Sequence, residues 1–86
     1  MHTIELFEQV LATARQLDYQ VRYENLGGSG GGGCEFGGKK WLFVDLALST
    51  IEQLDQVVEA LRADPAIRDA DVPPQIREAL GLSKAA

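Results

Sequence analysis

Four side chains between positions 23 and 45 are the main candidates for chemistry: Tyr23, Cys34, Glu35 and Asp45. Cys34 is the only cysteine, and its thiol could act as a nucleophile if nearby positive charge favoured the thiolate. The adjacent Glu35 carboxylate opposes that ionisation unless a lysine lies across the hairpin. Because free cysteine is among the most buried residue types, we expect Cys34 to be a small buried residue of a strand.

Asp45 is a carboxylate within the most apolar stretch of the chain, residues 39–48. One interpretation is structural: Asp45 lies on the second face of the sheet and pairs with Arg22 or a lysine, or it reaches solvent at a rim. The other is functional, a binding or catalytic carboxylate near Cys34 and Tyr23. We favour the structural interpretation, since structural ion pairs also place acids in such positions.

The glycines are concentrated, with eight of nine between positions 27 and 38. Residues 28–33 match G-x-G-x-x-G, and residues 33–40 come within one residue of G-x-x-x-x-G-K-[ST], with Lys40 in place of the hydroxyl. Both motifs need a helix directly after the glycines, and here strands follow, so no nucleotide or other cofactor is predicted. Ordering glycine costs much backbone entropy, so we expect residues 27–33 to be mobile, or held only by a ligand or partner.

Composition excludes several classes of protein. The 86 residues form one domain, 1–86, and the net charge of -5 makes nucleic acid an unfavourable partner. The start of the chain lacks the pattern of a signal peptide, and no apolar run is long enough for a membrane span, so we expect a cytoplasmic protein that binds no membrane. A single cysteine fits a reducing compartment. One histidine, His2, and one cysteine cannot build a usual zinc site, and we expect no metal.

Periodicity predicts the elements that would position these side chains. Apolar residues recur at spacings of three and four over residues 3–17, which predicts a helix capped by Thr3. Alternation over residues 19–24 predicts a strand, and residues 34–36 and 39–48 predict two more strands joined by Gly37-Gly38 as a type I′ turn.

The second half of the chain is predicted to be helical. Ser49 and Glu52 form a capping box for a helix that ends near residues 64–65. A loop over 64–72 precedes a short helix over 75–80 that Gly81 ends, and residues 83–86 are expected to be frayed. The predicted fold is a two-layer α+β domain: helix, three-stranded mainly antiparallel sheet, helix, and a short C-terminal helix.

The third strand is apolar on both faces, so the sheet should present two different surfaces. The face under the helices is expected to carry Leu42, Val44, Leu46, Tyr19, Val21 and Tyr23. The opposite face is expected to carry Trp41, Phe43, Asp45, Gln20, Arg22, Glu24 and Glu35. Trp41 and Phe43 are then either covered by residues 67–82 or bound to another chain.

Four segments resemble a group of small uncharacterised bacterial proteins: 23–28 (YENLGG), 33–37 (GCEFG), 42–45 (LFVD) and 73–77 (PPQIR). The group shares a tyrosine-bearing strand, a glycine-cysteine hairpin, an apolar strand ending in aspartate, and a proline-led C-terminal helix. The resemblance implies that the glycine-rich segment is native to the chain and that Cys34 and Asp45 are important residues of the protein. It implies no reaction.

Two functions remain open. The first is a non-enzymatic protein-interaction module, a homodimer that uses the face with Trp41, Phe43 and Arg22 or the edge of the short strand 34–36. The second is a small thiol or ligand-binding activity in which the glycine-rich loop closes over Cys34, Tyr23 and Asp45, with Glu35 nearby.

Overall fold

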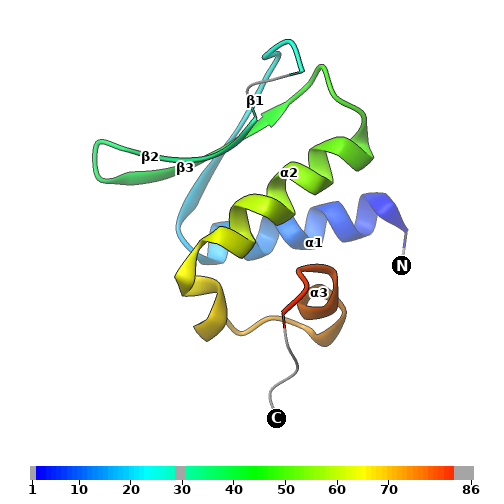
Figure 1. The fold of residues 1–86 in the computed structure, drawn as a ribbon, viewed down its shortest axis with the longest axis vertical. Helices are drawn as coiled ribbons and strands as arrows, with labels where there is room; N and C mark the ends of the chain where they lie inside the picture. The colour runs from blue at the N-terminus through cyan, green and yellow to red at the C-terminus, as the bar shows by residue number, and fades with distance from the viewer. Residues whose placement is uncertain (1, 29–30, 83–86) are drawn as a thin grey trace.

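The computed structural model describes residues 2–28 and 31–82 and has the predicted α+β fold (Figure 1). Its elements in chain order are α1 (Thr3–Gln16), β1 (Tyr19–Glu24), β2 (Gly32–Phe36), β3 (Lys39–Asp45), α2 (Thr50–Ala63), the 3₁₀ helix η1 (Pro65–Asp69) and α3 (Pro74–Ala79). The predicted frayed tail, 83–86, and positions 29–30 of the predicted mobile loop lie outside the described residues.

The three strands form a mixed sheet in the order β1-β3-β2. β3 is central and pairs parallel to β1, with Tyr19 opposite Lys40, and antiparallel to β2, with Cys34 opposite Trp41. The β2–β3 turn has φ angles of 62° and 77° at Gly37 and Gly38, the positive values that the predicted type I′ hairpin requires. This local prediction is confirmed.

β3 ends at Asp45, three residues earlier than predicted. The Asp45 carboxylate accepts a hydrogen bond from the Ala47 amide at 2.9 Å and turns the chain away from the sheet. Leu46, predicted to lie under the helices, is instead 55% exposed. The prediction failed because the alternation of apolar residues continues at Leu46 and Leu48, although the bond between the Asp45 carboxylate and the Ala47 amide has already started a turn.

Both long helices cover one face of the sheet. In Figure 1 the strands lie to the upper left of α2 and α1, and α1 packs against β1 while α2 packs against both β2 and β3. Leu42 and Val44 of β3 point into the resulting core and are 0% and 2% exposed. The helices bury their predicted stripes only in part, because Ile4 and Ile51 at their first turns remain 64% and 62% exposed.

The C-terminal segment packs on the helices and not on the far face of the sheet. Ile67, Val72, Ile76 and Leu80 are all buried in the same core as α1 and α2, and Figure 1 places α3 on the side of these helices opposite the strands. Gly81, at φ 68°, ends α3 as predicted, with the Leu82 amide donating to the Arg77 carbonyl at 3.0 Å.

Two helix starts have different outcomes. The Ser49 capping box is present: the Glu52 amide donates to the Ser49 hydroxyl at 3.2 Å, and the Ser49 amide donates to the Glu52 carboxylate at 3.1 Å. The bond from the Ser49 amide, followed by hydrogen bonding from the Ser49 side chain to the same carboxylate, lowers the pKa of Glu52. The prediction that Thr3 caps α1 is wrong, because His2 occupies the cap position and makes no side-chain bond there.

Candidate functional site

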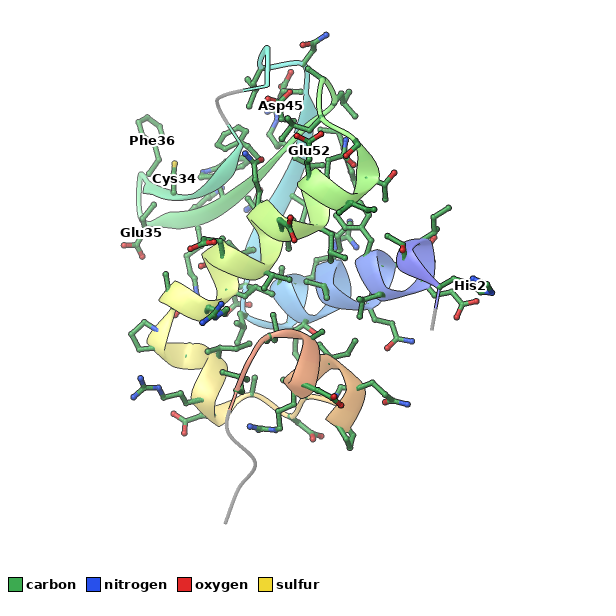
Figure 2. All side chains as sticks on the ribbon, turned by 45° about the vertical axis from the view of Figure 1, so that its right-hand side comes forward. His2, Cys34, Glu35, Phe36, Asp45 and Glu52 are labelled. Carbon is green, nitrogen blue, oxygen red and sulfur yellow. The ribbon has the colours of Figure 1, made fainter. Side chains whose placement is uncertain are left out.

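The face of the sheet away from the helices forms a surface that no described element covers. Strand register places the side chains of Gln20, Arg22, Glu24, Cys34, Phe36, Lys39, Trp41 and Phe43 on this side. Five of them line one depression, and we call these five the open face: Arg22, Cys34, Phe36, Trp41 and Phe43. Paired residues point to the same side of a sheet and neighbours along a strand alternate. Figure 2 agrees, with Phe36 and Glu35 on opposite sides of the hairpin.

Aromatic side chains dominate the open face. The rings of Trp41 and Phe43 stack with centroids 6.3 Å apart and an interplanar angle of 21°. Phe36 is 75% exposed. All five open-face side chains line one shallow depression of about 310 Å³. A surface of this kind is typical of an interaction site, because large aromatic rings gain most from leaving water.

Cys34 is exposed on this face, so the prediction of a buried cysteine is wrong. β2 is an edge strand, and Cys34 lies opposite Trp41, which directs its side chain away from the helices. Composition alone favours burial for cysteine. Register decides otherwise here, and the thiol borders the aromatic depression.

Arg22 gives the open face a charged border on β1. Its guanidinium donates to the Glu24 carboxylate at 2.9 Å, and the two side chains are 55% and 42% exposed. An exposed pair of this kind contributes little to stability. It leaves the Arg22 side chain accessible beside Phe43, its neighbour across the strands.

Asp45 is fully buried, with 0% of its surface exposed, so it does not reach solvent at a rim. Its carboxylate accepts backbone N–H groups from Leu26 at 2.9 Å, Gly28 at 2.7 Å and Ala47 at 2.9 Å. A carboxylate held by several amides is a structural acceptor that replaces lost hydration. Asp45 therefore holds the start of the glycine-rich segment at the end of β3. Arg22, one of its expected partners, forms its ion pair with Glu24.

The candidate thiol or ligand residues do not gather at one place. Cys34 lies opposite Trp41 of β3. Trp41 precedes Asp45 by four residues, so Cys34 and Asp45 are separated by about 13 Å along the direction of the strands. Tyr23 pairs with Val44 and belongs to the helix side of the sheet, where it is 49% exposed. Glu35 pairs with Lys40 and also points to the helix side, contrary to its expected place on the open face.

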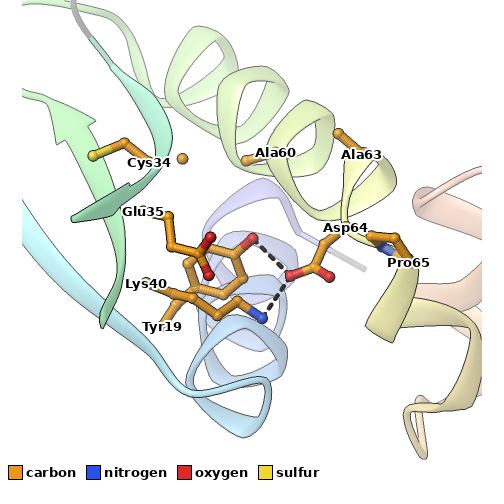
Figure 3. A pocket seen from close by; sticks show the side chains of 9 residues that line it. Tyr19, Cys34, Glu35, Lys40, Ala60, Ala63, Asp64 and Pro65 are labelled. Atoms are coloured by element: carbon orange, nitrogen blue, oxygen red, sulfur yellow. Dashed lines mark hydrogen bonds and ion pairs between the residues drawn. The ribbon is translucent and has the colours of Figure 1, made fainter. Parts of the chain in front are cut away.

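A polar pocket of about 410 Å³ lies on that helix side, between the β2–β3 hairpin and the end of α2 (Figure 3). Asp64 accepts from the Tyr19 hydroxyl at 2.9 Å and pairs with the Lys40 ammonium at 2.6 Å. The same ammonium lies 4.5 Å from the centre of the Tyr19 ring. Glu35 lines the pocket as well, whereas the Cys34 sulfur points away from Asp64.

Two residues of the pocket, Tyr19 and Asp64, have shifted pKa values. Burial, followed by the hydrogen bond to Asp64, raises the pKa of Tyr19 to about 12. Partial burial acts to raise the pKa of Asp64, but the bonds from Lys40, the Ala66 amide and Tyr19 together lower it. The raised pKa of Tyr19 and the lowered pKa of Asp64 both preserve the bond between the Tyr19 hydroxyl and the Asp64 carboxylate near neutral pH, which suits a structural contact between the sheet and the end of α2.

This pocket was missed from the sequence. One signal was present: Lys40 stands two residues before Leu42 and therefore shares its helix-covered face. The partner Asp64 follows α2 directly, but nothing in the sequence gives the distance between the end of that helix and the start of β3.

Other site types find no support in the part of the chain that the structure describes. Among residues 2–28 and 31–82, no three or more His, Cys, Asp or Glu side chains cluster in a way that could hold a metal ion. No helix within these ranges is long and apolar enough to cross a bilayer. Comparisons with family models, with curated proteins and with solved structures found no match to this chain. The candidate site therefore depends on its geometry alone.

Proposed function

We propose that this chain is a non-enzymatic protein-interaction module that forms a homodimer through the open face of its sheet and the adjoining edge of β2. One observation carries the proposal: a stacked Trp41–Phe43 pair beside an exposed Phe36, on a face that the chain's described helices leave uncovered. The C-terminal segment could have covered this pair, and it packs on the helices instead.

Energetic considerations favour a partner over permanent exposure. Fully burying one large apolar side chain contributes about 1.5–3 kcal/mol, and aromatic residues supply the strongest anchors of protein interfaces. Phe36 keeps three quarters of its surface in water, at 75% exposed. Burying Phe36 and the neighbouring rings against a partner would make the free energy of association more favourable, and the monomer leaves this apolar surface in water.

The composition of the open face suits association between two polypeptides. Its centre is apolar and its border carries the Arg22–Glu24 pair, which matches the usual arrangement of an apolar interface core within a polar rim. Arginine is enriched at such sites because its flat guanidinium can stack and donate at once.

The alternative, a thiol or ligand-binding activity, has one favourable observation, the exposed thiol of Cys34. Its proposed companions are elsewhere, since Asp45 is buried and bonded to loop amides and Tyr23 lies on the helix side. The rate at which Cys34 reacts with a maleimide, compared with the unfolded chain, tests this activity. A native thiol that reacts no faster than the unfolded one contradicts an activated cysteine.

Light scattering with a matched pair of variants tests the interaction proposal. Phe36→Ser removes an exposed apolar side chain from the open face, and Ile51→Ser removes one of similar exposure, 75% against 62%, from α2. We expect the wild type and Ile51→Ser to be dimers and Phe36→Ser to be monomeric or far weaker in association. A monomeric wild type, or equal loss in both variants, contradicts the proposal.

A further inference from the structure

The geometry points to a defined mode for this dimer: the β2 strands of two copies pair antiparallel about a two-fold axis at Cys34, forming one continuous six-stranded sheet. This inference rests on the proposed homodimer and specifies its partner surface. The pairing joins the two open faces side by side and gives the free edge of each β2 a neighbouring strand.

The first ground is the exposed edge of β2. The sheet order β1-β3-β2 leaves one side of β2 without a strand partner among the described residues. Natural edges are usually guarded by lysine, proline or other inward charges against unwanted pairing. β2 reads GGCEF and has a single guarding charge, Glu35 on the helix side, while the other edge strand, β1, carries two charges, Arg22 and Glu24. β2 is therefore the edge more open to strand addition.

The second ground is that the strand complements itself in one register. Cys34 is the middle of the five residues of β2. Pairing about it places Phe36 opposite Gly32 of the partner subunit and Glu35 opposite Gly33 of the partner subunit. Each large side chain then faces a glycine, and the two carboxylates are diagonal neighbours about 7–8 Å apart. A register centred on Glu35 would set like charges directly opposite each other, which is unfavourable.

The third ground is space for the aromatic side chain. Apart from Gly32 and its two neighbours in the chain, no described residue has an atom within 4 Å of the place where a Cβ would stand on Gly32, so the surface above it is open. Gly32 is itself paired with Phe43 in β3. A Phe36 ring that lies across this glycine of the partner subunit would approach the partner's Phe43. The backbones of these two phenylalanines would be two strand spacings, or about 10 Å, apart. The exposed Phe36 would then pack at the border of the open face of the second copy.

The fourth ground is that the helices permit this approach. α2 packs against both β2 and β3, so its axis is set back from the edge by about half a strand spacing. Two such helices would lie roughly 9–10 Å apart across the axis, within the 8–10 Å usual for packed helices. The side chain of Ala60 is small and packs directly over Gly33 of β2, with its Cβ 3.2 Å from the place where a Gly33 Cβ would stand.

Disulfide formation at Cys34 provides the test, because the pairing makes it geometrically possible. Directly opposite residues in an antiparallel pair have Cα atoms about 4.5 or 5.5 Å apart, and both values fall within the range of about 4.4–6.8 Å that a disulfide accepts. With glutathione disulfide as oxidant, two Cys34 thiols give up two protons and two electrons and form one S–S bond. The oxidant takes them up to become two glutathione molecules.

The matched control is Cys34→Ser combined with Gln20→Cys, which moves the only thiol to the exposed edge strand β1. At micromolar protein we expect the Cys34 dimer to form about a hundredfold faster than the Gln20→Cys dimer, since opposed thiols have an effective concentration of millimolar or more. Equal rates overturn the inference, because they indicate random collision.

Light scattering on the reduced proteins separates the two proposals. If the reduced wild type is a dimer but Cys34 crosslinks no faster than Gln20→Cys, the β2 pairing is wrong and the homodimer stands. If the reduced wild type is a monomer at every concentration, both proposals fall. Hydrogen exchange gives a second readout: every second amide of β2 should lose protection when the dimer is diluted, and protection unchanged by dilution contradicts the pairing.

Discussion

Replacing Asp45 by asparagine tests whether its carboxylate organises the glycine-rich segment. Asp45 is 0% exposed and accepts from the amides of Leu26, Gly28 and Ala47. An asparagine keeps one acceptor oxygen and places an NH₂ donor against amides that also donate. The Asp45→Asn change therefore loses at least one charge-assisted bond and leaves a buried N–H without an acceptor.

The magnitude follows from these contacts. A hydrogen bond to a charged group contributes about 1.5–3 kcal/mol, and a buried donor left unsatisfied costs about 1–3 kcal/mol. We expect Asp45→Asn to lower the free energy of unfolding by about 2–4 kcal/mol. This is a large share of the total, since a domain of 86 residues has a stability of roughly 4–13 kcal/mol.

The assay is urea denaturation followed by the fluorescence of Trp41, the only tryptophan. All variants should be compared at one protein concentration, because a dimer's apparent stability depends on it. The control is Asp55→Asn, the same chemical change at an exposed position of α2, which we expect to stay within about 0.5 kcal/mol of the wild type. If Asp45→Asn also stays within that margin, the assigned role of the carboxylate is wrong.

Three further predictions concern local contacts. With Tyr23→Phe, Tyr19 is the sole tyrosine, and its absorbance should titrate near pH 12 and at lower pH after Asp64→Asn; no change contradicts the pocket bond. Because the folded pKa is raised above 10, the stability that Tyr19 contributes is present below pH 10 and is lost as pH rises through about 12. Ser49→Ala should lower the free energy of unfolding by about 1 kcal/mol through loss of its cap, and a neutral result would be unexpected for a capping box. Gly37→Ala should cost about 1–2 kcal/mol, since φ is 62° there, and a stabilising effect would argue against the turn.

Short-range signals were enough to predict the elements. The Gly37-Gly38 turn and the Ser49 capping box each depend on residues within four positions of one another, and both were confirmed. The α+β fold followed from the order of these elements. The residues of the proposed interaction surface, Trp41, Phe43 and Arg22, were placed on one face by alternation alone, and the structure brings them together.

Contacts that depend on strand order could not be predicted. The sequence does not state that β3 is central, and that arrangement sets β2 at the edge and exposes Cys34. Likewise, the buried Asp45 carboxylate accepts from the amides of Leu26 and Gly28, and the sequence does not show that residues 26–28 pass close to it. The Tyr19–Asp64 bond joins positions 45 residues apart, and no local pattern encodes such a distance.

Sedimentation of the unmodified, reduced chain over a range from micromolar to millimolar concentration tests the central claim most directly. An open face of stacked and exposed aromatic rings should drive the chain to a species of twice 9.4 kDa as concentration rises. A single species of 9.4 kDa throughout, with Trp41 emission unchanged by dilution, would contradict the claim that two copies associate through this face and the adjoining edge of β2.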